Sequence, residues 1–203
     1  MKLLYEYHRD SDLVAQKPDF VNDYSEIEDT LKDISDDDLI ETFNRRKVER
    51  PNIKSLSEPI NFLIKERLQQ LNWNIESGIF KEPPYNTTNS SRWRLDFAKN
   101  NISVEVAFNH GEAIAHNIMK PVLASELNHV QKEIQTKMGI IITATNNMKI
   151  KGGFDSAVGS FEKFIEYFKP YNMLIPTPII LIGIDEPETF YIDKESKEVA
   201  RYT

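Results

Sequence analysis

The chain has 203 residues and a mass of 23.6 kDa, with 40% hydrophobic and 28% charged residues, and it contains no cysteine. This length suits one domain, and the absence of cysteine excludes disulfides, zinc-thiolate sites and thiol nucleophiles. The formal net charge of −7 argues against a protein that coats nucleic acid through bulk electrostatics alone.

The first ten residues lack the apolar segment of a signal peptide, and no apolar run reaches the ~18 residues that a membrane span needs. We therefore expect a cytoplasmic protein with no membrane partner. Its charge is unevenly distributed, because an acidic stretch over residues 19–41 is followed directly by a basic one. These cations form either a local basic surface or a solvated helix end of mixed charge: Arg45, Arg46, Lys47, Arg50 and Lys54.

Residues 1–55 are predicted to form a helical accessory segment. Two short helices are expected over 24–33 and 36–47, with Ser25 and Ser35 as N-caps and Pro51 after the second. The next element, Ser57–Asn72, is a strong amphipathic helix with Ser57 as its cap. Its apolar face comprises Ile60, Leu63, Ile64, Leu68 and Leu71.

Residues 81–91 combine Pro-Pro with Asn, Thr and Ser and are predicted to be a loop. Two strands follow, over 92–98 and 102–108, around an Asn-Asn turn. A helical stretch is expected after Gly111, in which Pro121 breaks or kinks the path and a helical stripe continues through Leu123, Leu127, Val130 and Ile134.

The last third alternates between apolar strands and a helix. Continuous apolar runs predict buried strands over 139–144 and 178–184, and the pattern between them predicts a polar loop over 146–153 and a helix over 154–167. Residues 189–192 are expected to form an edge strand. The expected fold is therefore α/β, a mixed central β-sheet flanked by helices, with residues 56–203 as one compact core and an N-terminal helical appendage.

Each predicted hairpin strand contains one carboxylate in an apolar setting. Asp96 lies among Leu95, Phe97 and Ala98, and Glu105 lies between two valines. A buried acid needs a partner, and Mg²⁺ accepts oxygen ligands alone. Such a site suits phosphodiester hydrolysis, whereas the alternative is two acids that reach solvent at strand ends or pair with Arg92 and Arg94.

Other cofactor sites are not indicated. The spacing of the histidines, with His110 and His116 six residues apart, does not match the HExxH zinc arrangement. Gly152-Gly153 lacks the Gly-Lys-Ser/Thr ending of a P-loop, so we expect no nucleotide cofactor.

The segment from Asp96 to Phe108 resembles the catalytic hairpin of the PD-(D/E)xK nuclease fold, and more specifically that of type II restriction endonucleases of the BglII and BstYI group. The resemblance extends to the preceding helix and the late strand, and covers about 130 residues from Ser57 to Pro187. It implies that Asp96 and Glu105 bind Mg²⁺ in a catalytic core, and that a homodimer cuts both strands of duplex DNA at a short palindromic site.

One position departs from the family pattern. The residue two after the second acid is usually Lys, or Gln in the BglII branch, whereas this chain has Ala107. Either a neighbouring residue supplies the missing function, or the site is impaired and the protein is a sequence-specific DNA-binding protein without cleavage. Asn109 is the first candidate neighbour, because strand alternation places it on the face of Glu105, and His110 is the second.

Further candidates come from elements around the hairpin. Glu66 on the preceding helix is a candidate third metal ligand, or else a solvent-facing partner of Lys65 or Gln70. Base recognition in duplex DNA uses Asn, Gln, Arg or Lys. The candidate DNA-binding residues are Asn146, Asn147, Lys149 and Lys151 in the polar loop, with Arg45 and Arg46 as outer phosphate contacts.

Overall fold

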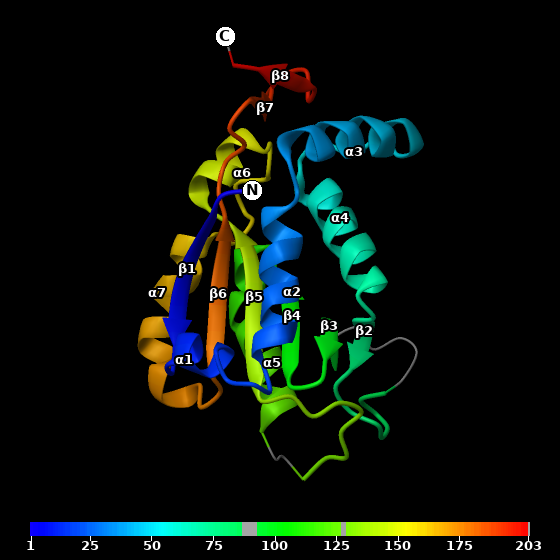
Figure 1. The fold of residues 1–203 in the computed structure, drawn as a ribbon. Helices are drawn as coiled ribbons and strands as arrows, with labels where there is room; N and C mark the ends of the chain where they lie inside the picture. The colour runs from blue at the N-terminus through cyan, green and yellow to red at the C-terminus, as the bar shows by residue number, and fades with distance from the viewer. Residues whose placement is uncertain (87–92, 127–128, 203) are drawn as a thin grey trace.

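A computed structural model describes residues 1–86, 93–126 and 129–202, and is built around a mixed six-stranded sheet (Figure 1). Strands β4, β5 and β6 are parallel to one another, and the remaining neighbours pair antiparallel. In spatial order the strands are β1 (Leu3–His8), β6 (Ile179–Ile184), β5 (Met138–Ala144), β4 (Ile102–Val106), β3 (Arg94–Lys99) and β2 (Asn74–Gly78).

Helices cover both faces of this sheet (Figure 1). One face packs against α2 (Val21–Lys32) and α4 (Ser57–Gln70), with α1 (Ser11–Ala15) and α3 (Asp36–Glu49) beside them. The other face packs against α5 (Ile114–Ser125) and α7 (Phe161–Tyr171). The expected α/β class, a mixed sheet flanked by helices, is confirmed.

Smaller elements complete the fold. A second, two-stranded sheet is formed by β7 (Phe190–Ile192) and β8 (Val199–Arg201), and lies with α6 (Asn146–Lys151) beyond the carboxyl end of β5 (Figure 1). Two short 3₁₀ helices are η2 (Gly111–Ala113) and η3 (Asn172–Leu174). Within the described residues, no helix has the length and apolar character that crossing a membrane requires.

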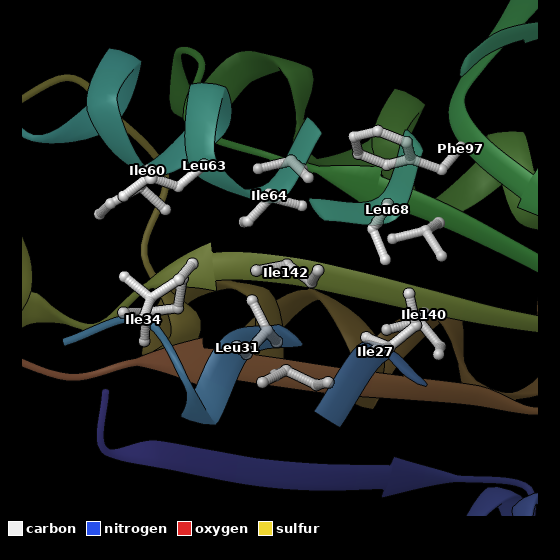
Figure 2. Close-up of a cluster of buried hydrophobic side chains, with 14 of the residues drawn as sticks. Ile27, Leu31, Ile34, Ile60, Leu63, Ile64, Leu68, Phe97, Ile140 and Ile142 are labelled. Atoms are coloured by element: carbon white, nitrogen blue, oxygen red, sulfur yellow. The ribbon is translucent and has the colours of Figure 1, made fainter. Parts of the chain in front are cut away.

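The core is divided by the sheet because successive side chains of a strand point to opposite faces. Ile140 and Ile142 of β5 pack toward α2 and α4, whereas Ile141 packs toward α5 and α7. Figure 2 shows the first cluster, in which the α4 side chains face those of α2 and β5. Four residues of the predicted apolar face of α4 are buried, namely Ile60, Leu63, Ile64 and Leu68, whereas Leu71 is exposed.

The first 55 residues differ from the expected helical appendage. Residues 3–8 form β1, which pairs antiparallel with β6 as a strand of the central sheet. Ile27, Leu31 and Phe43 of α2 and α3 are fully buried in the largest core cluster. The expected N-terminal helices are present as α1, α2 and α3, and β1 is an addition to them, while the proposed boundary at residue 55 stays a prediction.

Helix starts were predicted with mixed success. Ser35 caps α3 as expected and forms a capping box with Asp38. Ser25 lies inside α2, and Ser57 is the first residue of α4 rather than its N-cap.

Three later elements also differ from the sequence prediction. The helical stripe after Gly111 ends with α5 at Ser125, so Val130 and Ile134 are not helical, and Leu127 lies outside the described residues. The helix expected from residue 154 begins at Phe161, where Ser160 caps it. The polar loop expected over 146–153 contains α6, because the Thr145 hydroxyl accepts a hydrogen bond from the Met148 N–H and caps that helix.

Candidate active site

The hairpin of β3 and β4 brings the two predicted acids together. The strands are joined by Asn100 and Asn101, and Asn100 adopts a φ of 47°, a left-handed conformation that asparagine tolerates well. The β3–β4 pairing ends at Phe97↔Val104, and Asp96 and Glu105 are the next residue of each strand beyond that pair. The charge of Asp96 acts on Glu105, so the two carboxylates lie close together.

Asp96 is held by the backbone of the facing strand. Its Oδ2 accepts a hydrogen bond of 2.7 Å from the Val106 N–H. Burial raises the pKa of the Asp96 carboxyl, while the Val106 hydrogen bond and the charge of Lys120 oppose the increase.

Glu105 is almost completely buried, with 1% of its side chain exposed. Its Oε2 accepts a hydrogen bond of 2.5 Å from Lys120 Nζ, which reaches across from α5. Among the described residues, Glu105 Oε1 is buried and has no hydrogen-bond partner. Burial and the nearby charge of Asp96 raise the pKa of Glu105 to about 8, against the opposing effect of Lys120.

A third acid lies beside this pair. Glu76 on β2 falls opposite Asp96 when the β2–β3 register is continued, and its φ of 52° is left-handed. Its side chain is exposed and lies 3.2 Å from Lys65 Nζ. A surface depression is lined by Asp96 and Glu76 together with Asn61 and Lys65 of α4, so the Asp96 side of the site is open to solvent.

The donor set suits a hard divalent cation. Two carboxylates provide oxygen ligands, and Glu105 Oε1 is a buried acceptor that no described residue satisfies. The described residues contain no cluster of three or more Asp, Glu, His or Cys side chains placed to hold a metal. Glu66, the predicted third ligand, is exposed on α4 and belongs to no such cluster. Mg²⁺ commonly retains several waters, so two protein carboxylates are a sufficient set.

The two candidate neighbours of Ala107 lie beyond the end of β4. The strand stops at Val106, and the Phe108 N–H donates to the Val106 carbonyl, so the chain turns earlier than expected. The expectation that alternation continues through Asn109 is therefore wrong. Asn109 is exposed and its Oδ1 accepts a hydrogen bond of 2.9 Å from Asn117 Nδ2, while His110 is exposed at the start of η2.

Ala107 itself is buried against the α5 side of the sheet. Only 1% of it is exposed, and it packs in one cluster with Ile114, Ile118 and Ile141. This small side chain lies where α5 packs on β4. Because α5 packs on this face, the ammonium of Lys120 lies at Glu105, although the two residues are fifteen positions apart in the chain.

The predicted base-contacting residues lie on α6, at the end of β5. Asn146 and Asn147 are exposed, and the Asn147 amide lies 3.4 Å from Asp185. Lys149 donates to the carbonyls of Ser156 and Val158, and so contacts its own loop. Lys151 lies over the rings of two aromatic residues, Tyr191 and Tyr202.

The two arginines of α3 differ in their exposure and in their ion pairs. Arg46 is bound by Glu58 and Glu49, at distances of 2.5 to 2.8 Å, and only 15% of its side chain is exposed. Arg45 is exposed and stacks on Phe62. Arg45 is therefore better placed than Arg46 for a phosphate contact.

Comparison with known proteins identifies the family. A family model described as restriction endonuclease BglII/BglIII matches residues 4–184, and that span includes the hairpin, α5 and every strand of the central sheet from β1 to β6. The chain belongs to this family. Membership of the BglII family confirms the resemblance inferred from the hairpin, and makes the chain a member of a family of DNA-cleaving restriction enzymes.

Solved structures of BglII share this fold. The crystal structure of BglII complexed with a DNA 16-mer is 20% identical, with a TM-score of 0.67, and the match covers 99% of this chain and 88% of that chain. The crystal structure of free BglII is 18% identical, with a TM-score of 0.53 and coverage of 94% and 83%. No curated protein sequence matches the chain.

Two charged residues of the site were absent from the sequence prediction. Lys120 lies on a helix that follows the hairpin, and Glu76 lies in a short, largely polar strand that the sequence pattern did not indicate. The contact of Lys120 with Glu105 depends on how α5 packs over β4. Neither residue follows a fixed spacing from the acids, so no motif could have identified them.

Proposed function

We propose that this protein is a Mg²⁺-dependent type II restriction endonuclease that hydrolyses phosphodiester bonds of double-stranded DNA at a short palindromic site. The observation that supports this best is the pair of nearby carboxylates, half-buried Asp96 and buried Glu105, whose oxygen Glu105 Oε1 is unsatisfied among the described residues. Membership of the BglII family agrees with this chemistry.

Asp96 and Glu105 would hold the metal. Bound Mg²⁺ supplies an activated water and neutralises charge on the phosphate under attack. The protein contributes rigidity, since the Val106 N–H fixes one carboxylate and burial excludes water from the other. Asn109 and His110 are the proposed assisting residues; both are exposed beyond the end of β4, and the Asn109 amide is held by Asn117.

The DNA-binding surface is proposed to lie at the carboxyl end of the parallel strands. Helices α3 and α6, which carry Arg45 and the two asparagines, lie at this end of the sheet (Figure 1). A related BglII structure contains a DNA 16-mer. A palindromic site requires two symmetric half-site contacts, so we propose a homodimer. The net charge of −7 restrains non-specific attraction to phosphate and favours specific binding.

Digestion of phage DNA with purified protein tests this function. We expect discrete fragments in Mg²⁺, none in EDTA, and none from Asp96→Asn in Mg²⁺. Absence of fragments from the wild-type protein, or equal cutting by Asp96→Asn, contradicts the proposal. A gel shift at one defined duplex site with no nicking in Mg²⁺ or Mn²⁺ would instead indicate the alternative function, a DNA-binding protein that has lost cleavage with Ala107.

A further inference from the structure

The contact between Lys120 and Glu105 is unusual for its burial. Only 12% of the lysine side chain and 1% of the glutamate side chain are exposed, and the two atoms lie 2.5 Å apart. Among the described residues, this is the only hydrogen bond and the only ion pair of the Lys120 ammonium. Burial of an ammonium is costly and lysine is rarely so enclosed, so its position at the two acids calls for a physical reason.

The same contact places two cations at one carboxylate once a metal binds. Glu105 Oε2 is occupied by the lysine, so Oε1 is the Glu105 oxygen that is open to a divalent cation held with Asp96. An ammonium on one oxygen of a carboxylate is repelled by a divalent cation on the other. Metal binding should therefore displace the ammonium from Oε2, and the flexible four-carbon side chain of lysine can move its three N–H donors to a nearby acceptor.

In the proposed reaction the scissile phosphate supplies such an acceptor. In hydrolysis, the oxygen of water forms a new bond to phosphorus while the bond from phosphorus to the leaving sugar oxygen breaks, with one proton lost to solvent by the water and one taken up by the leaving oxygen. Negative charge grows on the non-bridging phosphate oxygens during this exchange, and a positioned lysine stabilises it. The chain directly after β4 provides no cation here, because Ala107 carries a methyl group and the Asn109 amide is bonded to Asn117.

We propose that Lys120 is a catalytic residue that leaves Glu105 when the metal binds and then donates to a non-bridging oxygen of the scissile phosphate. This inference depends on the proposed nuclease function and deepens it. It also resolves the departure at position 107, since the missing donor comes from α5 instead of β4.

Two measurements on Lys120→Met test the proposal, with Lys169→Met as the matched control. Lys169 is an exposed lysine on α7, away from the acids. The first measurement is Mn²⁺ affinity of the DNA-free protein, followed by electron paramagnetic resonance of free Mn²⁺. Loss of the competing ammonium should tighten binding ~10-fold. The second is the single-turnover rate of duplex cleavage at saturating Mg²⁺, which should fall by ~100-fold or more.

The expected rise in Mn²⁺ affinity and the expected fall in cleavage rate have opposite directions. A variant that merely disturbed the structure of the site would weaken both. Tighter Mn²⁺ binding with a rate within threefold of wild type overturns the proposal, because Lys120 would then be only a counter-ion. Unchanged or weaker Mn²⁺ binding also overturns it, since the lysine would not compete for the carboxylate. Lys120→Arg, which keeps the charge, should recover part of the lost rate, and no recovery contradicts the role of the cation.

Failure of the nuclease function is distinguishable from failure of this inference. A wild-type protein that cuts no duplex refutes the proposed function and with it the phosphate contact, while the Mn²⁺ comparison reports whether Lys120 and metal compete. If the wild-type protein cuts duplex DNA and Lys120→Met cuts it equally well, the inference about Lys120 is refuted and the nuclease function is not. Should near-ultraviolet circular dichroism show that Lys120→Met is unfolded, Lys120→Gln takes its place in both measurements.

Discussion

The Asp96 carboxylate accepts a hydrogen bond from the Val106 N–H at 2.7 Å, so a side chain of β3 takes the place of a main-chain acceptor at the end of the hairpin. One oxygen of Asp96 is thereby committed to the fold, and the other is available to a ligand. The carboxylate is fixed beside Glu105 before any ligand binds. Such preorganisation lowers the cost of assembling a charged site.

Asp96→Asn and Asp96→Ala should separate the two roles of this carboxyl. The asparagine carbonyl can still accept from Val106, so we expect an unfolding free energy close to that of wild type but a cleavage rate reduced by ~1000-fold or more, because a metal ligand is lost. Asp96→Ala leaves the Val106 N–H without its acceptor and should cost ~1–3 kcal/mol of stability as well. Urea unfolding and single-turnover cleavage measure the two effects.

Equal stability of the two variants would show that the Val106 contact contributes nothing to the fold. Retained cleavage by Asp96→Asn would remove Asp96 from the metal site.

Metal affinity should depend on pH through Glu105. Its pKa is raised to about 8 in the metal-free protein, so at lower pH the carboxyl holds a proton that Mg²⁺ must displace. Apparent Mg²⁺ affinity should therefore rise by ~10-fold per pH unit from pH 6 toward pH 8, and level off above it. Titration calorimetry in buffers of different ionisation enthalpy measures both the affinity and the proton released.

Glu105→Gln is the control for this dependence, because its amide does not titrate in this range. A wild-type affinity that is flat between pH 6 and 8 would contradict the raised pKa.

The N-terminal segment should contribute to the stability of the whole fold. Leu31 of α2 is fully buried in the largest core cluster, so Leu31→Ala should reduce the unfolding free energy by ~2–5 kcal/mol. Leu13 is 59% exposed, and Leu13→Ala should change the unfolding free energy by less than ~0.5 kcal/mol. A single unfolding transition shifted by Leu31→Ala indicates one cooperative unit, whereas two transitions would support a division near residue 55.

Residues of α6 should differ in their effect on DNA binding. Asn146 is exposed at the first turn, and Asn146→Ala should weaken binding of the cognate duplex by ~1–3 kcal/mol and relax selectivity at one base pair. Lys149 donates to two carbonyls of its own loop, so Lys149→Ala should lower thermal stability more than it weakens DNA binding. Binding in Ca²⁺ to a panel of single-mismatch duplexes measures selectivity; uniform loss across the panel for Asn146→Ala would exclude base readout.

Strong hydrophobic patterns were sufficient to predict the centre of the fold. The isoleucine-rich runs of β5 and β6 and the apolar stripe of α4 lie in the expected elements, because burial on both faces or along one stripe leaves a clear pattern. β1 and β2 were missed for the opposite reason. β1 is a short edge strand whose sequence, Leu-Leu-Tyr-Glu-Tyr-His, has no regular polar–apolar alternation, and β2 is short and mostly polar, so neither gives a clear strand pattern.

Asp96 and Glu105 could be singled out from the sequence because isolated carboxylates in apolar strands are conspicuous, and the resemblance to the family's hairpin gave them their proposed role. Lys120 was not, since its contact with Glu105 arises from packing between elements rather than from spacing along the chain. α6 was mistaken for a loop because its residues are polar, and the capping hydroxyl of Thr145 has little weight in a composition count. Asn109 was expected on the Glu105 face, but β4 ends three residues earlier than Asn109.

The sequence of DNA ends in a complete digest of a large duplex by the wild-type protein in Mg²⁺ tests the proposed nuclease function most directly. We expect every end to derive from one short palindrome, cut at the same symmetric position on both strands, and Asp96→Asn to produce none of these ends. Ends scattered over unrelated sequences, or an uncut duplex under conditions in which the protein is folded and binds Mg²⁺, would contradict it.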